Sequence, residues 1–164
     1  MAVAADRVYL MDRQTRPVAI ERILCFDARS GARLWEHHYE ADYTGIAYDN
    51  GPRTTPAVFQ SHVYTLGGAG KLHCLDSASG SPVWSRDLVK QDGAAIPAWG
   101  FCASPFVWKD LLIVHAGAPQ EGCLIALNRL TGTKVWSSLA DAAGYATPII
   151  AEAGGTPQLV CWTP

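Results

Sequence analysis

Three residues with binding chemistry occupy equivalent places in the chain. Each stands just ahead of a Ser/Thr-Pro pair that opens a short apolar run: Arg53, Cys102 and Tyr145. Two aromatic residues, Tyr48 and Trp99, lie close by in segments rich in Gly, Pro and polar residues. A guanidinium binds an anion through two parallel hydrogen bonds, and an indole ring offers a surface for stacking. These five residues are the candidate ligand-binding set.

A structural role is the alternative for the same residues. Arg53 would then pair with a neighbouring Asp, and Trp99 would fill the segment in which it lies. Other chemical patterns are weaker. The run Gly67–Lys71 lacks the spacer and the following Ser/Thr of a phosphate-binding loop. His37 and His38 are adjacent, so on a strand they point to opposite faces and cannot share a metal ion. We assign no catalytic, cofactor-binding or metal-binding residue.

The five cysteines form no CxxC pair and no adjacent pair. Cys25 and Cys74 both stand two residues before the Asp of a repeated motif described below. A repeated position within a strand favours a small buried apolar side chain over a ligand or a disulfide. Cys102, Cys123 and Cys161 have no partner that the sequence identifies.

Composition excludes several classes of partner. The 164 residues carry a formal net charge of −2, so no basic surface for nucleic acid is expected. The longest strongly aliphatic run, Leu111–Val114, is far too short to span a membrane. The first residues have neither the basic nor the long apolar region of a signal peptide, so no signal peptide is expected in this chain.

The elements that position the candidate residues follow from a repeat. The pattern Asp/Asn-x-x-Ser/Thr-Gly-x-x-x-Trp occurs three times, at 27–35, 76–84 and 128–136. Around each copy lie short apolar runs separated by tight turns, at four strands per 40 to 50 residues. This spacing is typical of propeller blades. We predict an all-β fold, a partial β-propeller of four-stranded antiparallel blades, with about three and a half blades.

The predicted blades form a single domain over residues 1–164. They span about 1–38, 54–88 and 103–139, and a half blade spans 145–164. Within each motif the Asp or Asn would close a turn and the Gly would supply a positive φ. The Trp would present its ring to the next blade. In a propeller the first strand of a blade lines the central channel, so Arg53, Cys102 and Tyr145 should approach the axis.

The three motifs resemble the tryptophan-docking motif of the PQQ-like (quinoprotein-type) β-propeller repeat family. That family contains eight-bladed quinoprotein alcohol dehydrogenases. It also contains non-catalytic propellers, such as the lipoprotein of the outer-membrane assembly machinery, and secreted repeat proteins. The resemblance implies a periplasmic, outer-membrane-associated or secreted parent protein. It also implies a PQQ and calcium site if the chain is part of a dehydrogenase, although the adjacent cysteines that clamp PQQ in that class are missing here.

Two functional hypotheses follow, with a third and plainer one. The first is a non-catalytic binding or scaffold module that uses a protein partner, or self-association through its open edge. The second is a fragment of a PQQ- and calcium-dependent dehydrogenase. The third is a truncated gene product without independent function. Three and a half blades cannot close a ring, and an unpaired sheet edge invites another chain.

Overall fold

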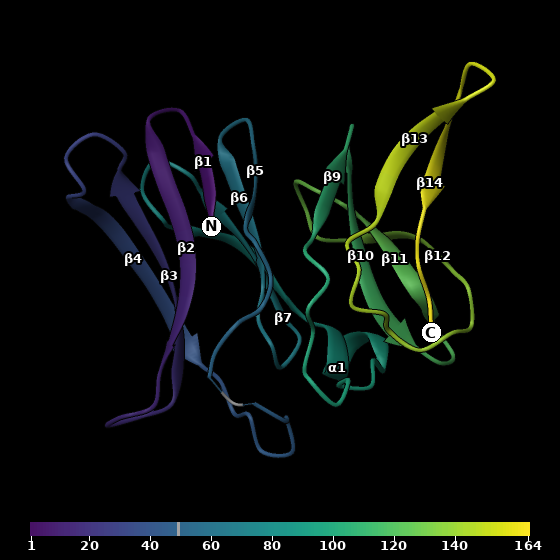
Figure 1. Ribbon diagram of the computed structural model, residues 1–164, viewed down its shortest axis with the longest axis horizontal. Helices are drawn as coiled ribbons and strands as arrows, with labels where there is room; N and C mark the ends of the chain where they lie inside the picture. Colours follow the sequence, from purple (N-terminus) through teal and green to yellow (C-terminus); the bar gives the residue numbers. More distant parts are fainter. Residues whose placement is uncertain (49) are drawn as a thin grey trace.

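The computed structural model of the protein describes residues 1–48 and 50–164. Within that part of the chain there are three four-stranded antiparallel sheets, one two-stranded sheet and one short helix (Figure 1). The sheets stand beside one another in chain order and do not close into a ring. The prediction of an all-β, partial propeller is therefore confirmed.

Each sheet is made of strands that are consecutive in the sequence, and we number the sheets one to four. Sheet one contains β1 (Ala2–Ala4), β2 (Arg7–Gln14), β3 (Ile20–Asp27) and β4 (Arg33–Glu40). Sheet two contains β5 (Ala57–Phe59), β6 (His62–Leu66), β7 (Lys71–Asp76) and β8 (Pro82–Asp87). Sheet three contains β9 (Phe106–Trp108), β10 (Leu111–Ala118), β11 (Gly122–Asn128) and β12 (Lys134–Ser138). Sheet four contains β13 (Ile149–Ala153) and β14 (Thr156–Val160).

The core lies between neighbouring sheets, and the central strands of sheets two and three are buried on both faces. Between sheets one and two, Tyr9 and Ile23 pack against Val63 and Leu75. A larger cluster joins sheets two and three and includes Leu66, Leu72, Val114 and Ile125 among others. Cys25 and Cys74 are fully buried within these two clusters, which confirms their prediction as small apolar core residues.

In all three motif turns the Asp or Asn side chain accepts backbone N–H hydrogen bonds, and in the first two it also accepts a bond from the Ser hydroxyl. In the first, the Asp27 carboxylate accepts hydrogen bonds from the backbone N–H and the hydroxyl of Ser30, both at 2.7 Å. Asp76 makes the same pair of bonds with Ser79, each at 2.8 Å. These bonds stabilise the charged carboxylate and lower the pKa of Asp27 and of Asp76. Each turn then passes through its glycine at positive φ.

Two of the motif tryptophans join one sheet to the next. The Trp35 indole N–H donates to the Ser77 carbonyl at 3.1 Å, and its ring lies over Gly80. In the same way, the Trp84 indole donates to the Arg129 carbonyl at 3.0 Å and its ring lies over Gly132. A Cβ atom on Gly80 would stand only 2.6 Å from the Trp35 ring, so only glycine permits this approach.

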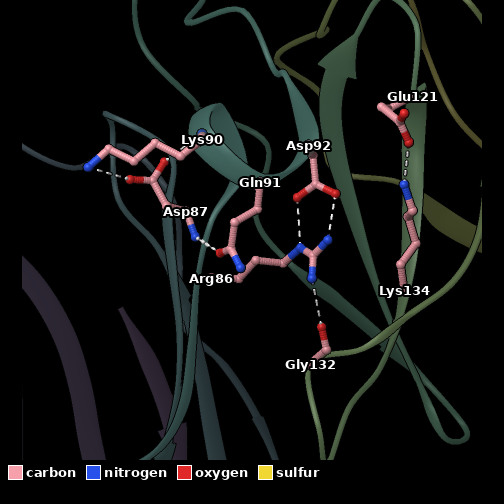
Figure 2. A network of polar contacts seen from close by, with 8 residues as sticks. All are labelled: Arg86, Asp87, Lys90, Gln91, Asp92, Glu121, Gly132 and Lys134. Atoms are coloured by element: carbon pink, nitrogen blue, oxygen red, sulfur yellow. Dashed lines mark hydrogen bonds and ion pairs between the residues drawn. The ribbon is translucent and has the colours of Figure 1, made fainter.

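A buried ion pair reinforces the contact between sheets two and three, where the Trp84 ring lies over Gly132. The helix α1 (Leu88–Asp92) follows β8 directly and begins at Asp87, whose carboxylate accepts from the Lys90 N–H. Arg86 donates two hydrogen bonds to the Asp92 carboxylate, at 2.7 and 2.6 Å, and a third at 3.2 Å to the Gly132 carbonyl (Figure 2). The Asp92 side chain is fully buried, so the pair fixes α1 against both sheets.

Gly31 and Gly80 supply a matched test of the contact between a motif tryptophan and the glycine of the next sheet, which we call the joint. Gly31 and Gly80 have φ of +69° and +74°, but a Cβ on Gly31 would meet nothing within 4 Å. Gly31→Ala should therefore cost only the backbone strain, about 1 kcal/mol. Gly80→Ala should cost about 3 kcal/mol, because it also displaces the Trp35 ring. Urea unfolding of the two variants measures the difference, and equal losses would contradict the joint.

The ion pairs in Figure 2 supply a second test. Asp92→Asn leaves the Arg86 charge buried without its partner, so we expect a loss of about 3 kcal/mol in the free energy of unfolding. The matched control is Glu121→Gln, which breaks the more exposed Lys134–Glu121 pair and should cost less than about 1 kcal/mol. Losses of similar size in urea unfolding would show that the Arg86 pair does not stabilise the helix.

Candidate functional site

The candidate residues lie in the segments that connect one sheet to the next. Tyr48 and Arg53 belong to the segment between β4 and β5, and Trp99 and Cys102 to the segment between α1 and β9. Tyr145 precedes β13. The first of these segments and α1 lie at the edge of the molecule that is lowest in Figure 1.

Hydrogen bonds connect these segments to one another at equivalent positions. The Thr55 N–H donates to the Ser104 hydroxyl at 2.8 Å, and the Ser104 N–H donates to the Thr147 hydroxyl at 2.9 Å. These are the Ser/Thr residues of the Ser/Thr-Pro pairs, and each belongs to a different sheet. They hold Arg53, Cys102 and Tyr145, which stand two residues earlier, at equivalent places on neighbouring sheets. This role of the hydroxyls was not foreseen from the sequence.

The Arg53 side chain hydrogen-bonds to the backbone of the segment in which it lies. Its guanidinium donates to the Ala47 carbonyl at 2.9 Å and also to the carbonyls of Tyr48 and Gly51. The Tyr48 ring is 74% exposed, and its backbone has a positive φ of +57°. A ligand that used the Arg53 guanidinium would have to displace backbone carbonyls. These bonds account for the position of the guanidinium without a bound anion, and Asp49, the nearest Asp in the sequence, lies outside the described residues.

Cys102 is turned toward the backbone of its own segment. The thiol donates toward the Gly100 carbonyl at 3.4 Å and the Trp99 carbonyl at 3.6 Å. Burial raises the pKa of the Cys102 thiol, and the nearby Arg53 charge opposes that rise. The thiol form of Cys102 therefore prevails at neutral pH.

Trp99 and Tyr145 meet, although 46 positions separate them. Their rings stack with centroids 5.2 Å apart and planes at 27°, and they are 50% and 42% exposed. A cavity of about 490 Å³ opens beside them, with Ile96, Pro97 and Ala142 among its walls. Of the five candidates, this pair is the one with a surface that can receive an apolar or aromatic group.

A buried carboxylate that the sequence did not reveal lies between sheets one and two. Glu21 is fully buried, and its carboxylate accepts from the Gly68 N–H at 2.9 Å and from the Tyr43 hydroxyl. The Arg13 guanidinium lies 4.1 Å above the centroid of the Tyr43 ring. Burial and the Glu21 charge raise the pKa of Tyr43, which therefore stays protonated and keeps donating. Glu21 thus fastens the glycine-rich turn of sheet two to sheet one.

Comparison with known proteins agrees with this architecture. Residues 2–161 match the model of the protein family described as outer membrane protein assembly factor BamB. The chain belongs to this family of PQQ-like propeller repeat proteins. No curated protein gives a significant match to the chain.

Solved structures with the same fold fall into two groups. BamB from Moraxella catarrhalis has a TM-score of 0.57 and 19% identity, covering 89% of this chain and 40% of its own. A europium-containing methanol dehydrogenase has a TM-score of 0.61 and 18% identity, covering 82% and 23%. Quinohemoprotein alcohol dehydrogenase from Comamonas testosteroni has a TM-score of 0.57 and 24% identity, covering 80% and 19%. The chain thus spans less than half the length of each, and these likenesses show the fold alone.

The residues that the structure describes do not themselves assemble a site for PQQ and calcium. No two cysteines are adjacent in the sequence. In residues 1–48 and 50–164, no three His, Cys, Asp or Glu side chains come together in a way that could hold a metal ion. We therefore derive no chemical step through either group. The same described residues include no helix long and apolar enough to cross a membrane.

A buried histidine makes the stability depend on pH. His73 stacks on Tyr39 at 4.2 Å, and burial, with His37 and Lys71 nearby, lowers its pKa to about 4. Between this value and the ordinary pKa of about 6.5, the unfolded chain binds more protons, so stability falls as the pH falls. The slope contributed by one such group approaches about 1.4 kcal/mol per pH unit.

Urea unfolding between pH 7 and pH 4.5 measures this dependence. His73→Phe should flatten the pH profile, whereas His38→Gln, at an exposed position, should leave it unchanged. A profile that stays steep in His73→Phe would assign the effect to other groups, such as His115 or His37, whose pKa burial also lowers.

Proposed function

We propose that the chain is a non-catalytic segment of a PQQ-like propeller that acts as a protein-binding scaffold. The observation that carries this proposal is a contact between a tryptophan and a glycine turn that is made twice between neighbouring sheets and has one component without the other on sheet one and on sheet three. Trp35 meets the turn of sheet two and Trp84 meets the turn of sheet three. The same two components occur once more: a glycine turn on the outer face of sheet one, and a tryptophan, Trp136, in the groove between sheet three and sheet four.

The glycine component is the turn of sheet one. Gly31 has the same backbone conformation as Gly80 and Gly132, but its Cα faces open space instead of a tryptophan ring. The turn itself is fully formed by the Asp27–Ser30 hydrogen bonds. It is therefore ready to receive an indole ring without rearrangement.

The tryptophan component is Trp136 on β12. It borders a groove of about 570 Å³, the β12–β14 groove, lined by Leu124, Trp136, Ser137, Ser138, Leu139, Leu159 and Cys161. No fourth copy of the motif follows Trp136 in this sequence. The partner we propose for the chain made alone is a second copy, whose Gly31 turn would occupy this groove as the Gly80 turn receives Trp35.

Other partners and the cellular location belong to the same proposal. The exposed Trp99–Tyr145 pair and its cavity offer a second surface, suited to apolar or aromatic side chains of a protein. The name of the matching family refers to outer-membrane protein assembly. On that basis we propose a periplasmic, outer-membrane-associated or secreted parent protein.

The second candidate function is a fragment of a PQQ- and calcium-dependent dehydrogenase. The likeness in fold to the two dehydrogenases favours it. The residues of this chain do not themselves form the cofactor site, so under this hypothesis other parts of a longer protein would supply it.

Light scattering of the purified chain tests the scaffold proposal. We expect a dimer or larger species at micromolar concentration, and we expect Trp136→Ala to shift it to the monomer because the ring of the half-made joint is removed. The control is Trp162→Ala, which removes an indole that is 78% exposed and lies outside the motif. A compact monomer in the unmodified chain would overturn the self-association.

The same measurement is repeated with PQQ and Ca²⁺. A mass and thermal stability that do not respond to either agree with the scaffold. A stoichiometric PQQ-dependent rise in melting temperature would favour the dehydrogenase fragment.

A further inference from the structure

Two cysteines far apart in the sequence contact one buried histidine. His115 on β10 is 1% exposed, and its Nε2 lies 2.9 Å from the sulfur of Cys123 on β11. Cys161, directly after β14, places its sulfur 3.9 Å from Nδ1 and 4.0 Å from Nε2 of the same ring. The cluster therefore connects sheet three with the end of sheet four.

The local backbone is shaped around this cluster. The pairing of β10 with β11 shifts register between His115 and Ala118, which brings His115 over Cys123. Gly144 approaches the ring so closely that a Cβ there would stand 2.7 Å from the His115 Cε1 atom. The Gly144 N–H donates to Nε2 at 3.0 Å, so Nε2 is the unprotonated nitrogen of a neutral imidazole.

The two thiols differ in access. Cys123 is fully buried, and besides its contact with the imidazole its thiol donates to the Ala142 carbonyl at 3.2 Å. Cys161 is partly exposed and lines the β12–β14 groove. A reagent in the groove can reach the sulfur of Cys161 but not that of Cys123. This is the arrangement of an attacking thiol with a sheltered resolving thiol.

We propose that Cys123 and Cys161 form a redox-controlled disulfide, with His115 as the residue that accepts the Cys123 proton. The oxidant is a small-molecule or protein disulfide. The Cys161 thiol, as thiolate, attacks it, forms a mixed disulfide and releases one thiol. Nε2 of His115 then gives up the hydrogen bond from the Gly144 N–H and takes the proton of Cys123, which attacks the Cys161 sulfur and releases the second thiol. The two cysteines lose two electrons and two protons, and the oxidant becomes two thiols.

The acid–base properties fit slow, controlled exchange. Burial raises the pKa of Cys161, and burial with the nearby Cys161 and Asp141 raises the pKa of Cys123 to about 11. Burial lowers the pKa of His115, while its backbone hydrogen bond to Ala146 and the Asp141 charge oppose that change. The thiols therefore stay protonated at neutral pH, and bridge formation should accelerate as the pH rises.

The bridge would fasten the two-stranded sheet to the rest of the protein. It would close the chain between positions 123 and 161, which includes β12, β13 and β14. Oxidation would thereby restrict the opening of sheet four and of the β12–β14 groove. The wall of the groove that sheet four forms would then be free to move in the reduced protein and held in place in the oxidised protein.

Mass spectrometry of the whole chain after exchange into glutathione buffers tests the proposal. Under oxidising conditions we expect a loss of two hydrogens, three alkylatable thiols instead of the five in the sequence, and one cross-linked peptide that contains Cys123 and Cys161. Limited proteolysis within 139–147 should slow at least tenfold in the oxidised form. Five free thiols, or a bridge that uses Cys102, would overturn the proposal.

Variants separate the roles of the residues. Cys123→Ser should leave Cys161 with a stable glutathione adduct, because the resolving thiol is missing, whereas Cys161→Ser should gain no adduct at position 123. His115→Gln should slow the second step at least tenfold at pH 7 and make its rate depend more steeply on pH. The control Cys102→Ser should behave as the unmodified chain does. An unmodified Cys161 in Cys123→Ser would contradict the proposed order of attack.

Discussion

The approach of a tryptophan ring to a glycine Cα in the next sheet is the interaction on which the architecture depends. Strands that are consecutive in the sequence form each sheet, so hydrogen bonds of the ladders hold sheets together internally but not to one another. The ring-on-glycine joint supplies contact area, and the indole N–H fixes its orientation through one carbonyl. The glycine and the tryptophan that this contact needs both belong to the repeated motif. The spacing of the motif along the chain therefore also sets the spacing of the sheets.

Buried polar groups fix the relative positions of the sheets that these apolar contacts hold together. Glu21 fastens a turn of sheet two to sheet one, and Arg86 connects α1 with the Gly132 turn of sheet three. In each case a charged group satisfies backbone atoms of a neighbouring sheet, which an apolar side chain cannot do. The sheets are therefore held at defined positions as well as in contact.

The architecture could be predicted from the sequence because it is encoded locally. A turn such as Asp27–Gly31 needs only residues within five positions, and three copies in register identify the repeat. The candidate site could be predicted only in part. Equivalent positions pointed to Arg53, Cys102 and Tyr145, but the stacking of Trp99 on Tyr145 depends on two separate segments. Glu21 and the pair Cys123 and Cys161 could not be found at all, since their partners are distant in the sequence.

The hydrogen bonds at Thr55, Ser104 and Thr147 have a mechanical consequence. The Ser104 hydroxyl links sheet three to sheet two, and the Thr147 hydroxyl links sheet four to sheet three, so each bond connects only neighbouring sheets. Sheet four has only two strands, and most of their side chains are exposed, so we expect it to open at a lower free-energy cost than the four-stranded sheets. Together with the tryptophan–glycine contacts, these short bonds contribute to the curvature of the row of sheets, and hence to the shape of the surface that it offers to a partner.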